Sequence, residues 1–173
     1  MTVVGNNYFQ ILELEQRYDI EQKLLQDRYL AKQMEYHPDL VVDGASKIRN
    51  IEISMFLNEA YKVLSDDYKR AEYLLKLNGF EFSDQQLNCQ LSISELEGIL
   101  EEYEEIEAMH ELADLIAKEQ QKLAMKAELI REITTHFNKN NFTKALDISI
   151  RLKYLTNLVG NIKLKIKHAN NRD

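Results

Sequence analysis

The only proline among 173 residues, Pro38, is the feature that most restricts how this chain can fold. Proline has no amide hydrogen and disfavours helix in the residue before it, so a helix that ends near Tyr36 must give way to a loop here. The loop is predicted to separate two helices and to present His37 and Asp39 together. Asp39 then either hydrogen-bonds its own backbone in a simple turn or is offered to a partner.

Apolar residues on both sides of this loop recur at helical spacing. Before it, a helix is predicted over about residues 20–35, with Asp19 as its cap. After it, the spacing of Ile53 and the apolar residues that follow predicts a helix over about 47–64, antiparallel to the first.

Two shorter helices complete this part of the chain. A first helix is predicted over residues 6–18, packed on the antiparallel pair. A fourth is predicted over about 67–77, capped by Ser65 or Asp66 and ended by Gly79.

Residues 81–92 lose the helical period and gain amide and serine side chains, so they are predicted to form a linker in which Cys89 has no chemical role. Three helices with one apolar stripe each are expected after it. The predicted inward residues are Leu96, Ile99, Tyr103 and Ile106, then Met109, Leu112, Ile116, Leu123, Ala127, Ile130 and Phe137, then Ala145, Ile148, Leu152, Leu155, Val159, Ile162 and Ile166. Because no strand-like alternation competes with these stripes, the predicted fold class is all-α.

The charge of the chain limits its partners. Acidic side chains outnumber basic ones by 29 to 22, whereas binding to phosphate backbones needs clustered Lys and Arg, so we expect no nucleic acid. The acidic excess is concentrated between residues 81 and 120, where it either forms a solvated face or steers a basic partner. No apolar run approaches the roughly twenty residues of a membrane span. With no targeting peptide visible, we predict a cytoplasmic protein, and a mature form in the mitochondrial matrix stays open.

The sequence contains few of the residue combinations that catalysis requires. His37 and Asp39 would suit a base and its orienter, yet no nucleophile or oxyanion loop accompanies them. The single Glu107-Ala108-Met109-His110 motif has no second copy, which a di-iron helix bundle would require. We therefore expect no catalytic residue, no metal and no cofactor, and the protein is not predicted to be an enzyme.

The order of motifs resembles a known module. After His-Pro-Asp come Asn58-Glu59-Ala60-Tyr61-Lys62-Val63-Leu64, then Arg70-Ala71-Glu72-Tyr73-Leu74-Leu75, then Leu77-Asn78-Gly79-Phe80. This order resembles a J-domain, the module that stimulates ATP hydrolysis by DnaK-type heat-shock chaperones. The ending, with an acidic helix and a long helical tail, resembles the HscB or Jac family of iron-sulfur co-chaperones over about residues 6–168.

The resemblance implies a J-domain over 1–80, the linker over 81–92 and a three-helix scaffold-binding domain over 93–173. The implied partners are an HscA/DnaK-type chaperone ATPase and an IscU-type iron-sulfur scaffold protein. The implied chaperone-binding residues are His37, Pro38 and Asp39 with the basic Arg28 and Lys32, and the implied scaffold-binding residues are Ile93, Glu97, Leu100, Glu101, Glu105 and Tyr154.

Three features of the sequence allow more than one interpretation. The family usually continues with lysine after Asp39, whereas this chain has Leu40-Val41-Val42. The basic side of the second helix is either a docking face or a solvated one, because acidic residues share that helix. A general J-domain co-chaperone with another client and a non-catalytic helical scaffold are the alternative functions.

Overall fold

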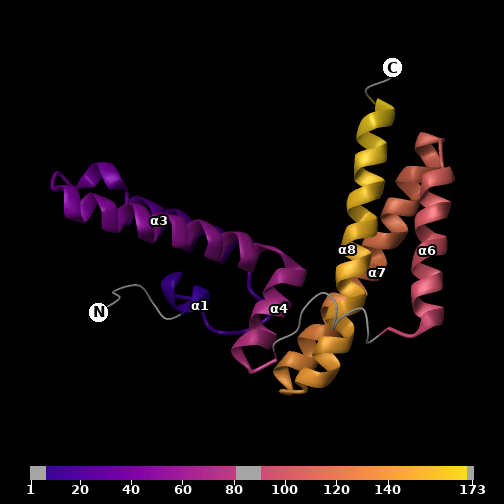
Figure 1. The fold of residues 1–173 in the computed structure, drawn as a ribbon, viewed down its shortest axis with the longest axis horizontal. Coiled ribbons are helices and arrows are strands. Elements are labelled where there is room, and N and C mark those ends of the chain that lie inside the picture. Colours follow the sequence, from indigo (N-terminus) through magenta and orange to yellow (C-terminus); the bar gives the residue numbers. More distant parts are fainter. Residues whose placement is uncertain (1–6, 81–90, 171–173) are drawn as a thin grey trace. The chain divides into compact units, whose positions relative to one another are not determined.

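The computed structural model describes residues 7–80 and 91–170, and within these ranges every regular element is a helix. In chain order they are α1 (Tyr8–Ile11), α2 (Gln22–Glu35), the short 3₁₀ turn η1 (Pro38–Leu40), α3 (Gly44–Ser65), α4 (Asp67–Leu77), α6 (Ile93–Ala108), α7 (Leu112–Asn138) and α8 (Phe142–Asn170) (Figure 1). The predicted all-α class is confirmed. A search of the same ranges found no helix with the length and apolar character to cross a bilayer.

Contacts divide the chain into two units, residues 1–74 and 75–173, so that the division falls within α4. The predicted linker lies almost entirely outside the described residues, as does Cys89, and the predicted boundary at 81–92 therefore stays a prediction.

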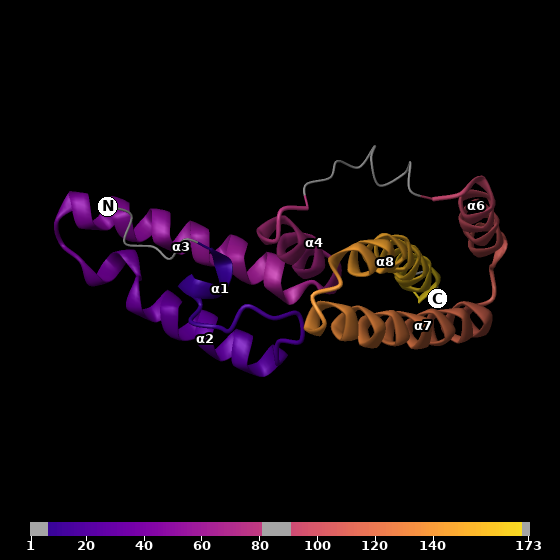
Figure 2. The ribbon, with the colours of Figure 1, turned by 90° about the horizontal axis from the view of Figure 1, so that it is seen from below.

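In the N-terminal unit, α2 and α3 form the predicted antiparallel pair (Figure 2). Leu25 of α2 and Leu57 of α3 are fully buried. The rings of Tyr29 and Tyr61 stack with centroids 4.4 Å apart, which fixes the pair at a second point. The spacing read from the sequence therefore identified the buried face of this hairpin.

The first helix is shorter than the predicted span of 6–18, because α1 ends at Ile11. Glu13 adopts a left-handed conformation with φ of 52°, and the amide of Leu14 bonds back to the carbonyl of Phe9 at 2.8 Å. This is the geometry that ends a helix. The extended segment after it buries Tyr18, which a continuous helix would not have placed there.

The predicted cap of the second helix is also wrong. Helix α2 begins at Gln22 without a side-chain cap, and the Asp19 carboxylate instead accepts a hydrogen bond from Arg17 Nε at 2.7 Å. Helix α3 begins at Gly44, three residues earlier than predicted, because Asp43 accepts a hydrogen bond from the amide of Ser46 at 2.8 Å and caps it.

The ends of α4 match the prediction. Asp66 accepts from the amide of Lys69 at 2.9 Å and caps the first turn. At the other end Gly79 has φ of +84°, and the amide of Phe80 bonds to the carbonyl of Leu75 at 3.0 Å. A left-handed glycine with this pairing is a common helix ending.

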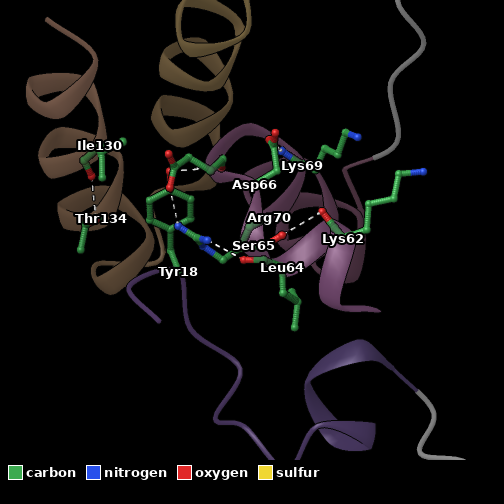
Figure 3. Close-up of polar contacts among 10 residues, drawn as sticks. Tyr18, Lys62, Leu64, Ser65, Asp66, Lys69, Arg70, Ile130 and Thr134 are labelled. Carbon is green, nitrogen blue, oxygen red and sulfur yellow. Dashed lines mark hydrogen bonds and ion pairs between the residues drawn. The ribbon is translucent and has the colours of Figure 1, made fainter. Parts of the chain in front are cut away.

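Arg70, which the sequence analysis quoted only as part of a motif, is a buried structural residue (Figure 3). Its guanidinium donates to the carbonyl of Leu64 at 2.6 Å and to Asp67 Oδ1 at 2.9 Å. The guanidinium carbon also lies 4.9 Å from the centre of the Tyr18 ring. Arg70 therefore joins the α3–α4 corner to the segment before α2.

In the C-terminal unit, α7 and α8 pack along each other, and α8 supplies most of the core. All but the last of its predicted inward residues are buried, and Ile166 is half-buried against the core. The predicted stripe of α7 is wrong at three positions, because Ile116, Leu123 and Ala127 are exposed.

The buried residues of α7 are Leu115, Lys122, Ile133 and Phe137, so its inward face runs through a lysine. The ammonium of Lys122 forms an ion pair with the Glu102 carboxylate of α6. A search for apolar residues alone could not find this face, since a buried charge depends on a partner from another helix.

Helix α6 begins at Ile93 with a side-chain cap. Ser92 accepts from the amide of Glu95 at 3.2 Å, and the Glu95 carboxylate accepts from the amide of Ser92 at 2.9 Å, which makes a capping box. Among α6 residues only Ile106 is buried, while Ile99 and Tyr103 are half-buried.

Candidate docking surfaces

The His-Pro-Asp turn lies between α2 and α3, and its backbone is fixed by two hydrogen bonds. His37 Nδ1 accepts from the amide of Asp39 at 3.2 Å, and the carbonyl of His37 accepts from the amide of Leu40 at 3.0 Å. Pro38 occupies the first position of η1, where its missing amide is not needed. The imidazole caps the turn, a role that the sequence analysis had considered only for Asp39.

This geometry directs polar groups outward. The side chains of His37 and Asp39 are 56% and 77% exposed. Since Nδ1 accepts a hydrogen bond, the neutral imidazole carries its proton on Nε2, which can donate to a partner. His37 Nδ1 lies 3.8 Å from Asp39 Oδ2, too far for the hydrogen bond that a base and its orienter require.

The predicted basic residues of α2 are both paired within the unit. Arg28 Nη1 lies 3.1 Å from a Glu13 carboxylate oxygen, and Lys32 Nζ lies 2.6 Å from the other oxygen. Lys32 Nζ also lies 2.9 Å from Glu35. The hydrogen bond that Lys32 donates holds the pKa of Glu13 below its usual range, and the hydrogen bonds that Lys32 donates to Glu13 and Glu35 raise the pKa of Lys32. Glu13 thus offsets the basic face, and the left-handed turn that places it was not visible in the sequence.

On α6, the predicted scaffold-binding residues are exposed without exception. These are Ile93, Glu97, Leu100, Glu101 and Glu105. Glu105 is not a free charge, since Lys118 Nζ of α7 lies 2.6 Å from it and lowers its pKa through that hydrogen bond. Among the predicted acidic residues of α6, Glu97 and Glu101 are therefore the candidates for attracting a basic partner.

Tyr154, the predicted residue of α8, is half-buried and lines a groove of about 670 Å³. Gly98 of α6, Met125 and Leu129 of α7 and the buried Lys122 also line it. A Cβ added at Gly98 would meet no atom within 4 Å, so the groove is open at this point. The sequence analysis did not find the groove, because three helices contribute to it.

The structure does not bring all predicted scaffold-binding residues onto one side. Because successive helical residues are about 100° apart, Leu100 lies about 160° round α6 from Gly98 and faces away from the groove. Glu101 and Glu105 lie about 60° and 20° from Gly98, so they border the side on which Tyr154 lies. Tyr154 of α8 therefore adjoins the side of α6 that carries Gly98, whereas Leu100 lies on the other side of α6.

The described residues contain no group of three or more His, Cys, Asp or Glu side chains that could hold a metal ion.

Comparisons with known proteins place both units. Residues 7–73 match the family model described as the DnaJ domain, and residues 96–163 match the model described as the HSCB C-terminal oligomerisation domain. The two matches stand in the order that the sequence analysis expected.

Similar proteins cover almost the whole chain. The co-chaperone protein HscB homolog of Vibrio cholerae is 27% identical over 91% of this chain and 95% of its own length. The human iron-sulfur cluster co-chaperone protein HscB is 28% identical over 92% of this chain and 68% of its own length. The crystal structure of human HscB, 26% identical, superposes with a TM-score of 0.85 over 93% of this chain and 82% of that one. Jac1 from Saccharomyces cerevisiae, at 22% identity and a TM-score of 0.75 over 92% of this chain and 93% of that one, shows the same fold.

Proposed function

We propose, from the premise that this chain belongs to the HscB family of J-domain co-chaperones, that it stimulates ATP hydrolysis by a DnaK-type chaperone and delivers an iron-sulfur scaffold protein of the IscU type to it. One observation carries the proposal: a single chain joins an exposed His-Pro-Asp turn to a C-terminal helical unit of the HscB type. The printed name of the human relative, an iron-sulfur cluster co-chaperone, supports the choice of client.

The chaperone side of this function relies on a preformed turn. The Asp39 carboxylate can accept hydrogen bonds from a cation on the chaperone, and His37 Nε2 can donate one. Because His37 Nδ1 already bonds to the backbone amide of Asp39, the imidazole and the backbone that carries the carboxylate are held in place before binding. Little conformational entropy is then lost when the chaperone docks.

The client side relies on α6 and the groove beside it. Glu97 and Glu101 give the helix a negative outer surface that attracts a basic partner and raises the association rate. Tyr154 offers an aromatic anchor next to the open position at Gly98. The co-chaperone itself performs no chemistry in this proposal, and we place it in the cytoplasm of a bacterium.

The test of the chaperone side is His37→Gln with His168→Gln as a matched control on α8. The His37 variant should lose stimulation of the chaperone ATPase while its free energy of unfolding stays within about 0.5 kcal/mol of the wild type, as for a surface change. The control should stimulate normally. Full stimulation by the His37 variant would refute the J-domain role, and unfolding of that variant would mean that the imidazole is structural.

The test of the client side is titration of Leu100→Ala and Tyr154→Ala against the cognate scaffold, with helicity measured in parallel. Loss of a desolvated anchor should weaken binding by about 1–2 kcal/mol. The two variants report on different sides of α6, so the one that weakens binding identifies the side in use. If both folded variants bind with unchanged affinity, this face is rejected and the client site lies elsewhere on the helical bundle.

A further inference from the structure

We propose that Glu13 is an intramolecular competitor, whose carboxylate occupies Arg28 and Lys32 of α2 until an acidic group of the chaperone displaces it. We refer to Arg28 and Lys32 together as the basic pair. This inference rests on the proposed function, in which a DnaK-type chaperone covers the His-Pro-Asp turn, and it concerns the regulation of that contact. Glu13 is not among the residues that the sequence predicted for docking.

One carboxylate bridges both cations of the basic pair. Glu13 Oε2 lies 3.1 Å from Arg28 Nη1, and Glu13 Oε1 lies 2.6 Å from Lys32 Nζ. Arg28 and Lys32 are one helical turn apart on α2, the spacing at which two side chains share a face. Because both oxygens of Glu13 are engaged, a carboxylate from a partner has to take the place that Glu13 already fills.

The backbone around Glu13 is fixed independently of these ion pairs. Leu12 before it and Tyr18 after it are buried, and the amide of Glu13 donates to the carbonyl of Gln10 at 3.1 Å. With φ of 52°, Glu13 adopts a conformation that is uncommon for a residue with a side chain and that persists only where the surrounding structure imposes it. Loss of the carboxylate should therefore leave the turn in place.

The bridge lies at the surface, where it can be exchanged. The side chains of Glu13 and Arg28 are 53% and 45% exposed, so water screens their attraction. Displacing Glu13 returns its carboxylate to water at low cost, because exposed ion pairs contribute little to stability. The bridge thus lowers the affinity of the basic pair for an acidic partner without preventing binding.

The basic pair adjoins the turn that the chaperone is proposed to cover. Lys32 Nζ lies 6.0 Å from the centre of the Tyr36 ring, and Tyr36 directly precedes His37. Since a standard interface covers about 800 Å² on each partner, a chaperone seated on the turn extends over these neighbouring residues. Its acidic groups then compete with Glu13 for the same two cations.

Other cations near the turn are not blocked in this way. Lys47 and Arg49 of α3 are exposed, and no carboxylate in the described part of the chain forms an ion pair with either. They remain available to an acidic partner whether or not Glu13 is displaced. Glu13 therefore controls only the α2 side of the contact, and its removal should strengthen binding rather than create it.

The test measures the ATPase rate of the cognate DnaK-type chaperone against the concentration of the full chain. Glu13→Gln should lower the half-saturating concentration about twofold to fivefold, because the amide keeps the shape of the side chain and loses the charge. The matched control is Glu21→Gln, at an exposed carboxylate of α2 that makes no capping bond, and it should change the value less than about twofold. Added salt should raise the value more steeply for Glu13→Gln than for the wild type, since the freed cations then face the partner directly.

A double-mutant cycle separates competition from a structural role. In a chain that carries Arg28→Gln and Lys32→Gln, the further change Glu13→Gln should leave the half-saturating concentration as it is. A decrease that persists there would mean that Glu13 acts through another residue, and the proposal would be refuted. An unchanged or raised value for Glu13→Gln alone, including a rise caused by loss of helicity in circular dichroism, would make the bridge structural and refute it as well.

These outcomes are distinct from a failure of the proposed function. If the wild type stimulates the chaperone, His37→Gln does not, and Glu13→Gln matches the wild type, the J-domain role stands and the competitor role is wrong. If the wild type itself does not stimulate the chaperone, the proposed function fails and the competitor role fails with it.

Discussion

The two units of the chain hold their helices in place by different means. In the N-terminal unit the corner between α3 and α4 is tied by the buried Arg70, and aromatic rings fasten the shorter elements: Tyr8 stacks on Tyr73 with centroids 4.3 Å apart. In the C-terminal unit an apolar seam joins α7 and α8, but α6 buries only Ile106. The half-buried Tyr103 packs on the same apolar cluster, and ion pairs and hydrogen bonds add a polar attachment.

The polar attachment of α6 comes from both neighbouring helices. Lys118 and Lys122 of α7 pair with its carboxylates, and Lys165 of α8 donates to the carbonyls of Ile106 and Glu107 at 2.8 and 2.6 Å. Cations at the C-terminal end of a helix also favour its dipole. The helix that carries the candidate client face is thus the one whose position depends most on charge, and salt and acid should loosen it before they affect α7 and α8.

The largest effect is expected for Arg70→Ala. Its removal takes the donors from the Leu64 carbonyl and from Asp67 and leaves a cavity beside Tyr18, so we expect a loss of about 4 kcal/mol in the N-terminal unit. Urea unfolding followed by segment-resolved NMR measures it. Arg131→Ala, at an exposed guanidinium of α7, is the control and should change stability by less than about 0.5 kcal/mol.

A second prediction concerns Ile106→Ala. Because Ile106 is the one buried residue of α6, its truncation should cost about 2–3 kcal/mol and should release α6 while α7 and α8 stay paired. Hydrogen exchange resolved by segment should then rise in α6 alone. Ile116→Ala, at an exposed position of α7, provides the comparison. Equal exchange in all three helices would show that the unit unfolds as a whole and that the contrast drawn above does not hold.

A smaller effect is expected at the start of α6. Ser92→Ala removes the hydroxyl that accepts from the amide of Glu95, which should cost about 1 kcal/mol. Ser94→Ala, at an exposed position without a capping role, should change little. Exchange rates in the first turn of α6 distinguish the two variants, and equal rates would mean that the capping box adds nothing to this helix.

The smallest effect is expected in the pH dependence of the free energy of unfolding. The pKa of Glu13 is lowered in the folded N-terminal unit by Lys32, so its contribution to stability is present above the unfolded pKa near 4.5 and is lost as pH falls through the lower folded value. Glu105 behaves in the same way through Lys118. Glu13→Gln and Glu105→Gln should therefore each reduce the loss of stability between about pH 5 and pH 3, in the N-terminal and the C-terminal unit respectively. Denaturation of each unit at several pH values, followed by NMR, tests this. The assignment would be contradicted if either variant reduced the pH dependence of stability in the unit that does not contain the substituted residue.

Local signals in the sequence found the elements that depend on few neighbours. The spacing from Ile53 to Leu64 predicted the buried face of α3, and Asp66 and Gly79 predicted the limits of α4. Such features need only a helical period or a cap a few residues away. The predicted Asp19 cap was wrong because the nearby Arg17 binds the same carboxylate. Local sequence rules do not decide whether that carboxylate caps the helix or pairs with the arginine.

Within the candidate sites, exposure was easier to predict than pairing. His37 and Asp39 are exposed at a turn, as the only proline indicated, and the glutamates of α6 lie on its surface. The pairing of Arg28 and Lys32 with Glu13 was missed, because a left-handed residue between α1 and α2 brings that carboxylate beside them. Sequence spacing gave no sign of this contact.

By itself the sequence determined that the chain is helical, where α4 begins and ends, and that a turn presents His37 and Asp39, because these features follow from local period, caps and one proline. Only the tertiary structure decided which charges form ion pairs and which side of α6 faces the groove with Tyr154. Lys122 became a core residue because Glu102 of another helix neutralises it, and Tyr154 joined Gly98 in a groove because three helices meet there. Ion pairs and grooves of this kind depend on distances between residues far apart in the chain, and those distances are fixed only when the helices pack.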